Sequence, residues 1–269
     1  MKFGLIGHPI EHSLSPALFK AGYGGKYPYD LIITKDFEEA YRRFLDGYDG
    51  INVTAPFKEL ALRHADIISE ECRLAGAANI LIKTPQGITA YNSDFRGLVA
   101  MFRGLKGDEK SVLPPWFFFH PLSDHEKTVL IVGAGGAGKA AKAAAEALGH
   151  ETVIVNRTRH SQEIKPLNAF REEFRKADIV IYNLPVRIPE IDLLTEADLC
   201  PGKEKVILEA NYRNPSFDKG SIQRMATMNP LIRYIDGREW LLQQAVAGYE
   251  LFTGEAPDYE AMKAVIKSK

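Results

Sequence analysis

A glycine-rich segment in the middle of the chain limits the possible folds more than any other feature. The apolar run Val129–Val132 is typical of a buried strand, and the alanine-rich segment that extends to Leu148 is typical of a helix. Between them, Gly133, Gly135 and Gly138 have the G-x-G-x-x-G spacing. A strand, this loop and a helix in that order predict a dinucleotide-binding βαβ unit. A glycine-rich turn that binds nothing is the alternative.

Each glycine of this loop has a physical role. Gly133 permits the tight turn, Gly135 lets the backbone approach a pyrophosphate, and Gly138 lets the helix pack closely on the strand. The helix N-terminus then offers unpaired N–H groups to the phosphates. The residues predicted to bind the cofactor here are Gly133, Ala134, Gly135, Gly136, Ala137 and Gly138.

The end of the next strand indicates which nucleotide is bound. Thr152–Val155 is the predicted second strand, and Asn-Arg-Thr-Arg follows it. A site for NAD usually has Asp or Glu here, to accept hydrogen bonds from the ribose 2′-OH. A neutral amide and two guanidiniums suit a 2′-phosphate instead, through charge-assisted hydrogen bonds. We therefore predict NADP, held in part by Asn156, Arg157, Thr158 and Arg159. Two solvated arginines in a turn are the alternative.

The composition is that of an ordinary globular protein. The chain has 269 residues, of which 45% are hydrophobic and 26% charged, and its net charge is -1. Nothing in this balance indicates a nucleic-acid or membrane partner, and no apolar run approaches the about 20 residues of a membrane span. Cys72 and Cys200 form no disulfide framework, and Met1–Ile10 lacks the form of a secretory signal. We expect a cytoplasmic protein, and the seven histidines form no convincing metal-ligand cluster.

Strands alternate with helices along the chain, which favours an α/β fold with parallel sheets. The length fits two domains. We expect residues 104–237 to form a doubly wound Rossmann domain, and residues 1–103 plus 238–269 to form a second α/β domain. Gly104–Lys127 is the predicted connector. Its aromatic run Trp116–Phe119 is too apolar for a free linker and is expected to pack against a domain or a second subunit.

Two loops of the predicted Rossmann domain follow buried strands. Residues 183–186, which begin with Asn183, follow the strand at 179–182, and residues 211–215 follow the strand at 206–210. In open parallel sheets, ligands bind at the carboxyl ends of the strands. Both loops are therefore expected to lie where they can touch a nicotinamide.

Two serines precede a predicted helix near the N-terminus. Ser15 before Pro16 predicts a helix start with Ser15 as the N-cap, and capping alone would explain that serine. Ser13 has no such explanation. Two hydroxyls beside a helix N-terminus would suit a polyhydroxylated or anionic small molecule.

Three further polar residues stand out from their surroundings. Lys58 follows a short strand and a proline turn and lies near the start of a helix predicted over 59–75, where a cation opposes the helix dipole. Asp94 begins a helix predicted over about 95–102, and its simplest role is that of an N-cap. Gln244 lies on the apolar face of a helix predicted over 238–252.

The order of these motifs resembles that of the shikimate dehydrogenase family. Residues 7–16 are similar to the opening motif of that family, and residues 52–58 to its catalytic-lysine motif. The segments at 76–79 and 92–97 are similar to its paired Asn and Asn-x-Asp segments. The resemblance covers nearly the whole chain. The lysine motif and the Asn-x-Asp segment are specific to the family, whereas the glycine loop is not.

The resemblance implies a substrate pocket between a substrate-binding domain, residues 1–103 plus 238–269, and an NADP-binding domain. The implied reaction is the reversible reduction of 3-dehydroshikimate to shikimate by NADPH, with Lys58 and Asp94 as the catalytic pair. By analogy with the family, Ser13 and Ser15 hold the substrate carboxylate. The other implied substrate contacts are Thr54, Asn79, Asp94, Tyr212 and Gln244.

The chain departs from the family pattern at a few positions. Ile80 and Ser93 stand where members usually have Thr, and residues 183–186 replace the Thr-Ser/Pro-x-Gly-Met loop that borders the nicotinamide. Two alternatives therefore stay open: use of quinate or NAD by the same enzyme, and a non-catalytic NADP-binding regulatory protein. The joint presence of Lys58, Asp94 and Gln244 argues against the second. The expected partners are small molecules alone, with a monomer or a homodimer as the assembly.

Overall fold

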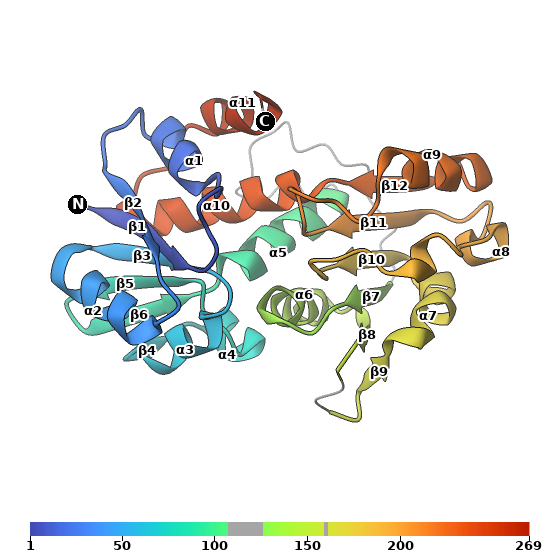
Figure 1. The fold of residues 1–269 in the computed structure, drawn as a ribbon, viewed down its shortest axis with the longest axis horizontal. Coiled ribbons are helices and arrows are strands. Elements are labelled where there is room, and N and C mark those ends of the chain that lie inside the picture. Colours follow the sequence, from blue (N-terminus) through green and yellow to red (C-terminus); the bar gives the residue numbers. More distant parts are fainter. Residues whose placement is uncertain (107–125, 159–160, 269) are drawn as a thin grey trace. The chain divides into compact units, whose positions relative to one another are not determined.

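The structure is a computed structural model that describes residues 1–106, 126–158 and 161–268 (Figure 1). The chain forms two compact units: unit 1 is residues 1–98 with 242–269, and unit 2 is residues 99–241. Arg159 and the aromatic run Trp116–Phe119 lie outside the described residues. The assignment of residues 1–103 plus 238–269 to substrate binding, and of 104–237 to cofactor binding, stays a proposal.

Unit 1 is built on a mixed sheet with the strand order β2-β1-β3-β5-β6-β4. The first three strands are parallel, β5 runs antiparallel to both β3 and β6, and β4 is parallel to β6. Its strands are β1 (Phe3–Gly7), β2 (Tyr29–Ile33), β3 (Gly50–Val53), β4 (Ile67–Ile68), β5 (Ile80–Thr84) and β6 (Gly87–Tyr91). The turn signal of residues 84–87 between two apolar segments predicts this β5–β6 hairpin, which the antiparallel pairing confirms.

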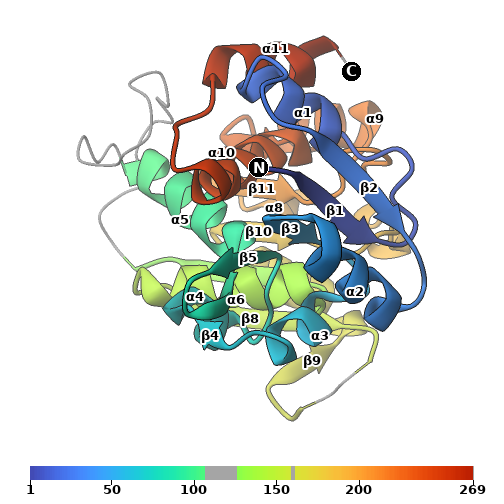
Figure 2. The same ribbon diagram turned by 90° about the vertical axis from the view of Figure 1, so that its left-hand side faces the viewer.

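Helices cover both faces of this sheet. They are α1 (Ser15–Gly22), α2 (Phe37–Gly47), α3 (Lys58–Arg63), α4 (Glu70–Ala75) and α11 (Tyr259–Ser268), with parts of α5 (Ser93–Lys106) and α10 (Gly237–Thr253). Because side chains alternate along a strand, Ile6 faces the core shared with α2 and α3, whereas Phe3 packs on Phe19 and Phe252 of α1 and α10. Helices α1 and α11 lie side by side (Figure 2).

The prediction of one helix over residues 59–75 is wrong, because α3 ends at Arg63 and α4 begins at Glu70. Between them, Ile67–Ile68 forms β4 and pairs with Thr89 and Ala90 of β6. The Asp66 carboxylate accepts a hydrogen bond from the Ile88 N–H at 2.7 Å and aligns that pairing. A long-range strand contact therefore interrupts a segment whose local pattern favours a helix.

Two predicted helix caps are also wrong. The N-cap of α1 is Leu14, and the Ser15 N–H donates to the Ser13 hydroxyl at 3.2 Å. Asp94 lies inside the first turn of α5, and the Asn92 side chain accepts the Phe95 N–H at 3.0 Å instead. Asn92 thus caps α5, whereas the N-cap residue of α1 makes no side-chain capping hydrogen bond.

Unit 2 contains a fully parallel sheet with the strand order β12-β11-β10-β7-β8-β9. Its strands are β7 (Thr128–Val132), β8 (Glu151–Asn156), β9 (Ile164–Pro166), β10 (Ile179–Tyr182), β11 (Lys205–Glu209) and β12 (Ile232–Ile235). Helices α6 (Gly136–Ala147), α7 (Phe170–Lys176), α8 (Glu196–Leu199) and α9 (Lys219–Met228) connect them, with short 3-10 turns at Leu167–Ala169 and Pro189–Ile191. This is the predicted doubly wound arrangement.

Different helices pack on the two faces of this sheet. Leu130, Val180 and Ile207 belong to the core that includes Phe174 and Met225 from α7 and α9. Ile131 faces the opposite side, where Gly138 of α6 approaches it. The described residues include no helix that is long and apolar enough to cross a membrane.

Candidate active site

The central pair of the candidate site is Lys58 and Asp94. Lys58 is the first residue of α3 and Asp94 lies in the first turn of α5. The Lys58 ammonium donates to the Asp94 carboxylate at 2.5 Å, and the two side chains are only 14% and 5% exposed. A charged hydrogen bond with so little access to water fixes the orientation of the amine. The ammonium is therefore a positioned cation and proton donor.

The backbone around Lys58 is tied to the neighbouring strands. The Ala78 N–H donates to the Lys58 carbonyl at 2.9 Å, which joins the start of α3 to the segment before β5. Thr54 donates its N–H to the Ile6 carbonyl at 2.9 Å. A Cβ on Gly7 would lie 2.4 Å from the Thr54 methyl, so only glycine allows this approach.

Asn79 joins three elements of unit 1. Its side-chain oxygen accepts the Ser93 N–H at 2.7 Å, and its amide nitrogen lies 3.0 Å from the Ser93 hydroxyl and 3.5 Å from the Gln244 side-chain oxygen. Gly97 lets α5 and α10 come together here, because a Cβ on it would lie 2.8 Å from the Gln244 nitrogen. The predicted residues Asn79, Asp94 and Gln244 thus lie on elements that pack against one another.

The two predicted serines form a small hydroxyl pair. The Ser13 hydroxyl lies 3.1 Å from the Ser15 hydroxyl. The Tyr249 hydroxyl donates to the Ser15 carbonyl at 3.1 Å, and the Tyr29 hydroxyl donates to Asn52 at 2.7 Å. Burial holds the pKa of Tyr29 well above its usual range, so its hydroxyl keeps its proton. Both tyrosines follow the ordinary pattern of core aromatics, so nothing in the sequence distinguishes them as neighbours of these polar groups.

The glycine loop of unit 2 has the geometry of a phosphate cradle. Gly133 has a φ of 104°, which favours glycine, and a Cβ on Gly138 would lie 2.0 Å from the Gly133 carbonyl oxygen. A Cβ on Gly135, by contrast, would meet nothing within 4 Å. Helix α6 begins at Gly136 without a side-chain cap or an acid in its first turn. This open backbone at a helix N-terminus fits a pyrophosphate.

The segment after β8 presents polar groups to solvent. The Asn156 amide donates to the Thr158 carbonyl at 2.8 Å, which bends the chain and leaves Arg157 and Thr158 exposed. An exposed guanidinium beside the glycine-loop strand suits a 2′-phosphate. Arg159 lies outside the residues that the structure describes.

Tyr212 lies in unit 2, whereas the other predicted substrate residues lie in unit 1. Asn183, which is predicted to bind the cofactor, also lies in unit 2. The Asn183 N–H donates to the Val132 carbonyl at 2.8 Å, so this residue sits beside the end of β7. Within the described ranges, no group of three or more His, Cys, Asp or Glu side chains is placed to hold a metal ion.

Comparison with known proteins decides the family. The shikimate dehydrogenase (NADP(+)) of Dinoroseobacter shibae is 30% identical to this chain over 280 residues, which cover 95% of this chain and 92% of the relative. The chain belongs to the shikimate dehydrogenase family. The enzyme of the same name from Caldanaerobacter subterraneus is 29% identical over 290 residues, covering 99% and 96% of the two chains.

Segment matches and solved structures agree with this family assignment. Residues 5–81 match the shikimate dehydrogenase substrate binding domain, and residues 237–267 match the shikimate 5'-dehydrogenase C-terminal domain. Residues 98–223 match the NAD binding domain of D-isomer specific 2-hydroxyacid dehydrogenases. Shikimate 5-dehydrogenase from Thermus thermophilus, solved with NADP(H) and shikimate, is 25% identical with a TM-score of 0.73 and covers 100% of this chain and 99% of its own.

The predicted resemblance and the predicted two-domain α/β fold are therefore confirmed. A quinate dehydrogenase from Corynebacterium glutamicum in complex with NAD shares the fold at 21% identity, with a TM-score of 0.74 over 100% of this chain and 99% of the other. Members of this fold are thus known with different substrates and cofactors. The roles of individual residues in this shikimate dehydrogenase family member stay predictions.

Proposed function

We propose that this chain catalyses the NADP-dependent, reversible reduction of 3-dehydroshikimate to shikimate. The buried Lys58–Asp94 pair, with its 2.5 Å hydrogen bond, is the observation that carries the proposal. A non-catalytic nucleotide-binding protein has no evident need for such a pair.

The chain's own residues supply a proton and an oriented charge. Reduction of a ketone places negative charge on its oxygen, and a positioned cation stabilises that charge. The Lys58 ammonium donates a proton to this oxygen in the reduction and takes it back in the oxidation, while Asp94 orients the amine. Bound NADPH supplies the hydride.

The proposed cofactor site uses backbone for the pyrophosphate and side chains for the 2′-phosphate. The loop 133–138 fits the pyrophosphate because Gly135 leaves open space at the N-terminus of α6. Asn156, Arg157, Thr158 and Arg159 bind the 2′-phosphate, which selects NADP over NAD. Asn183 lies at the carboxyl end of β10, on the side where nicotinamide binds.

The proposed substrate site is a set of hydroxyls and amides. Ser13 and Ser15 bind the substrate carboxylate, and their 3.1 Å separation lets both hydroxyls address one anionic group. The ring hydroxyls and the carboxylate are also contacted by Thr54, Asn79, Asp94, Tyr212 and Gln244. We place the protein in the cytoplasm as a monomer or homodimer that acts on small molecules, and its two free thiols fit a reducing compartment.

The test follows NADPH formation at 340 nm with shikimate and NADP, with quinate and with NAD in parallel. We expect turnover with shikimate and NADP. Faster turnover with quinate or NAD would keep the mechanism and overturn the assigned specificity. Tight NADP binding without turnover of any substrate would overturn the proposed activity in favour of a binding protein.

A further inference from the structure

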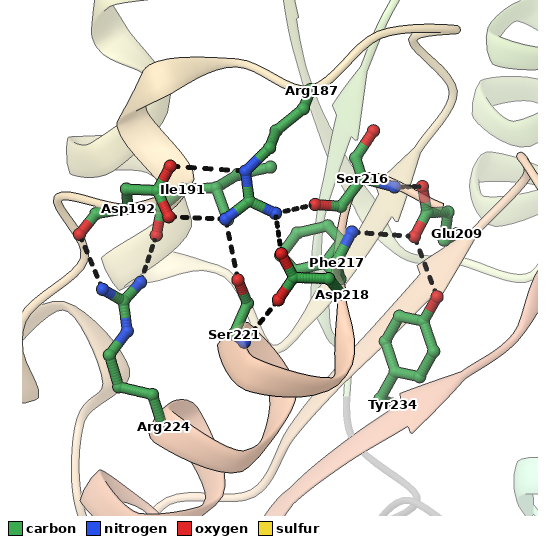
Figure 3. Close-up of polar contacts among 10 residues, drawn as sticks. All are labelled: Arg187, Ile191, Asp192, Glu209, Ser216, Phe217, Asp218, Ser221, Arg224 and Tyr234. Atoms are coloured by element: carbon green, nitrogen blue, oxygen red, sulfur yellow. Dashed lines mark hydrogen bonds and ion pairs between the residues drawn. The ribbon is translucent and has the colours of Figure 1, made fainter. Parts of the chain in front are cut away.

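Two loops at the carboxyl end of the unit 2 sheet are joined to each other at two places. Loop A, residues 183–187, follows β10, and loop B, residues 210–217, follows β11. Both lie at the sheet edge where ligands of parallel sheets bind. Figure 3 shows the polar contacts around one of these joins.

Arg187 is the centre of that join. Its guanidinium donates to the Ser216 carbonyl of loop B, to the Asp192 carboxylate at 2.5 and 3.3 Å, and to the Ser221 hydroxyl at 2.7 Å. It also lies 3.5 Å from the carboxylate of Asp218, the N-cap of α9. The planar fork of arginine thus connects loop A, loop B and the start of α9 (Figure 3).

Glu209 holds loop B from the strand side. This residue ends β11 and is 0% exposed. Its carboxylate accepts the Ser216 N–H, the Phe217 N–H at 3.2 Å and the Tyr234 hydroxyl at 2.8 Å (Figure 3). The same carboxylate raises the pKa of Tyr234, although burial raises it more, so the phenol stays a donor. The C-terminal end of loop B is therefore bound to the buried side chain of the residue that precedes the loop.

The other join is made by Asn211 of loop B. The Asn211 amide lies 3.4 Å from the Pro185 carbonyl of loop A and 2.8 Å from the Asn214 carbonyl of loop B. The Tyr182 hydroxyl donates to the Val186 carbonyl at 2.6 Å. Loop A is thus fixed at its middle by Asn211 of loop B and Tyr182 of β10, and at its end by Arg187.

A buried carboxylate is unfavourable unless its oxygens are hydrogen-bonded. Glu209 meets this condition with three donors, two of them backbone groups of the same loop.

The Arg187 side chain is only 28% exposed. Besides Asp218, it has three partners: the Ser216 carbonyl, the Asp192 carboxylate and the Ser221 hydroxyl. The contact from Arg187 also holds the pKa of Asp192 below its usual range. Such an arrangement differs from a solvated surface ion pair, because it fixes backbone.

We propose that Arg187 and Glu209 are positioning residues that hold loops A and B as one rigid border for the nicotinamide half of NADP. This inference rests on the proposed function. It also bears on the unusual sequence of residues 183–186, because Tyr182 and Asn211 bind this segment through the backbone carbonyls of Val186 and Pro185.

The experiment compares Arg187→Ala with the wild-type full-length chain. Misplacing a reacting group by about 1 Å costs about 10²-fold in rate, so we expect kcat to fall by about that factor. The affinity for NADP falls, whereas the affinity for 2′,5′-ADP, which lacks the nicotinamide half, is unchanged in calorimetry. Amide hydrogen exchange becomes faster in loops A and B, while β10 and β11 stay protected. Arg187→Lys restores only part of kcat, because an ammonium lacks the planar fork.

The matched control is Arg171→Ala. Arg171 also pairs with an aspartate, Asp198 at 2.7 Å, but this pair connects α7 with α8 and touches neither loop. We expect this variant to keep wild-type kcat and loop exchange. If Arg187→Ala fails to fold, Ser221→Ala removes one partner of the guanidinium and is expected to give smaller changes in the same direction.

Two results would overturn the inference. One is a wild-type kcat in Arg187→Ala with faster exchange in both loops, because catalysis then does not need the loops held. The other is faster exchange throughout unit 2, which indicates a general structural role. If the wild-type chain turns over no substrate, the proposed function fails, but the comparison of NADP with 2′,5′-ADP and the exchange data still test the positioning role.

Discussion

The two units prepare their proposed ligand groups in opposite ways. In unit 1 the groups are side chains that already have partners, such as the Lys58–Asp94 pair and the amide of Asn79 with Ser93. In unit 2 the glycine loop offers backbone N–H groups, and Gly135 leaves open space in front of them. The first arrangement positions charge for a reaction, and the second leaves room for a phosphate.

This contrast predicts different failures on mutation. A change in unit 1 removes a charge or a hydrogen bond, so the rate or the substrate affinity changes while the fold persists. A change in the glycine loop adds atoms where backbone must pass or where a ligand must lie. Substitution of one glycine should therefore lower the stability of the fold, and substitution of another should weaken cofactor binding.

The largest effect is expected for Lys58→Ala. Loss of a positioned proton donor typically lowers a rate by about 10²–10⁴-fold, and we expect kcat to fall within that range. Because the cofactor groups lie in unit 2, the Kd for NADP is expected to stay at the wild-type value. Stopped-flow and steady-state assays give the first quantity, and calorimetry gives the second. Full-rate turnover by a folded Lys58→Ala protein would remove Lys58 from the mechanism.

Gly138→Ala is expected to have the next largest effect. Its Cβ would lie 2.0 Å from the Gly133 carbonyl oxygen, which is backbone and cannot rotate away. Overpacking of this kind costs about 1–3 kcal/mol. We expect the free energy of unfolding, measured in urea, to fall by about 3 kcal/mol, at the upper end of this range.

Gly135→Ala is the matched control, because its Cβ meets nothing within 4 Å. This variant is expected to keep near wild-type stability and yet bind NADP more weakly, since the methyl group enters the space for the pyrophosphate. Equal stability loss in the two variants would contradict the contrast between packing and ligand space.

The sequence was sufficient for features that depend on local pattern. The strand-loop-helix at 129–148 and the hairpin at 80–91 follow from apolar runs and from turn residues. The predictions of helix caps were wrong where two polar residues near the helix start could both accept a backbone N–H. At Ser15 and Asp94 the pattern allowed a cap, but Ser13 and Asn92 accept the N–H groups instead. A choice between such neighbours depends on backbone geometry that the pattern does not contain.

Long-range contacts could not be predicted from the sequence. The pairing of Ile67–Ile68 with β6 and the bonds from Glu209 to the Ser216 and Phe217 N–H groups join segments whose approach depends on the whole sheet. For this reason the sequence did not point to Arg187 and Glu209, which bind loop B, or to Tyr29 and Tyr249, which bind Asn52 and the Ser15 carbonyl.

A smaller effect is expected for Arg157→Glu, which tests the exposed part of the cofactor site. A charge-assisted hydrogen bond contributes about 1.5–3 kcal/mol, and exposure favours the low end, so kcat/KM for NADP should fall about tenfold. NAD is the matched control within the same variant, because it has no 2′-phosphate and its kcat/KM should not fall. An equal fall for both cofactors would mean that Arg157 does not recognise the 2′-phosphate.

The smallest effect is expected for Tyr249→Phe, which tests whether paired groups in unit 1 also set substrate affinity. The change removes the hydroxyl that donates to the Ser15 carbonyl at 3.1 Å but keeps the ring beside Phe19. A hydrogen bond contributes about 1 kcal/mol net, so KM for shikimate should rise about fivefold with kcat unchanged. Tyr23→Phe is the matched control, because Tyr23 also contacts Phe19 and donates to a carbonyl, that of Glu255, away from the serines. If both variants raise KM equally, the aromatic cluster acts through stability alone, and the Ser13–Ser15 pair is not held for the substrate.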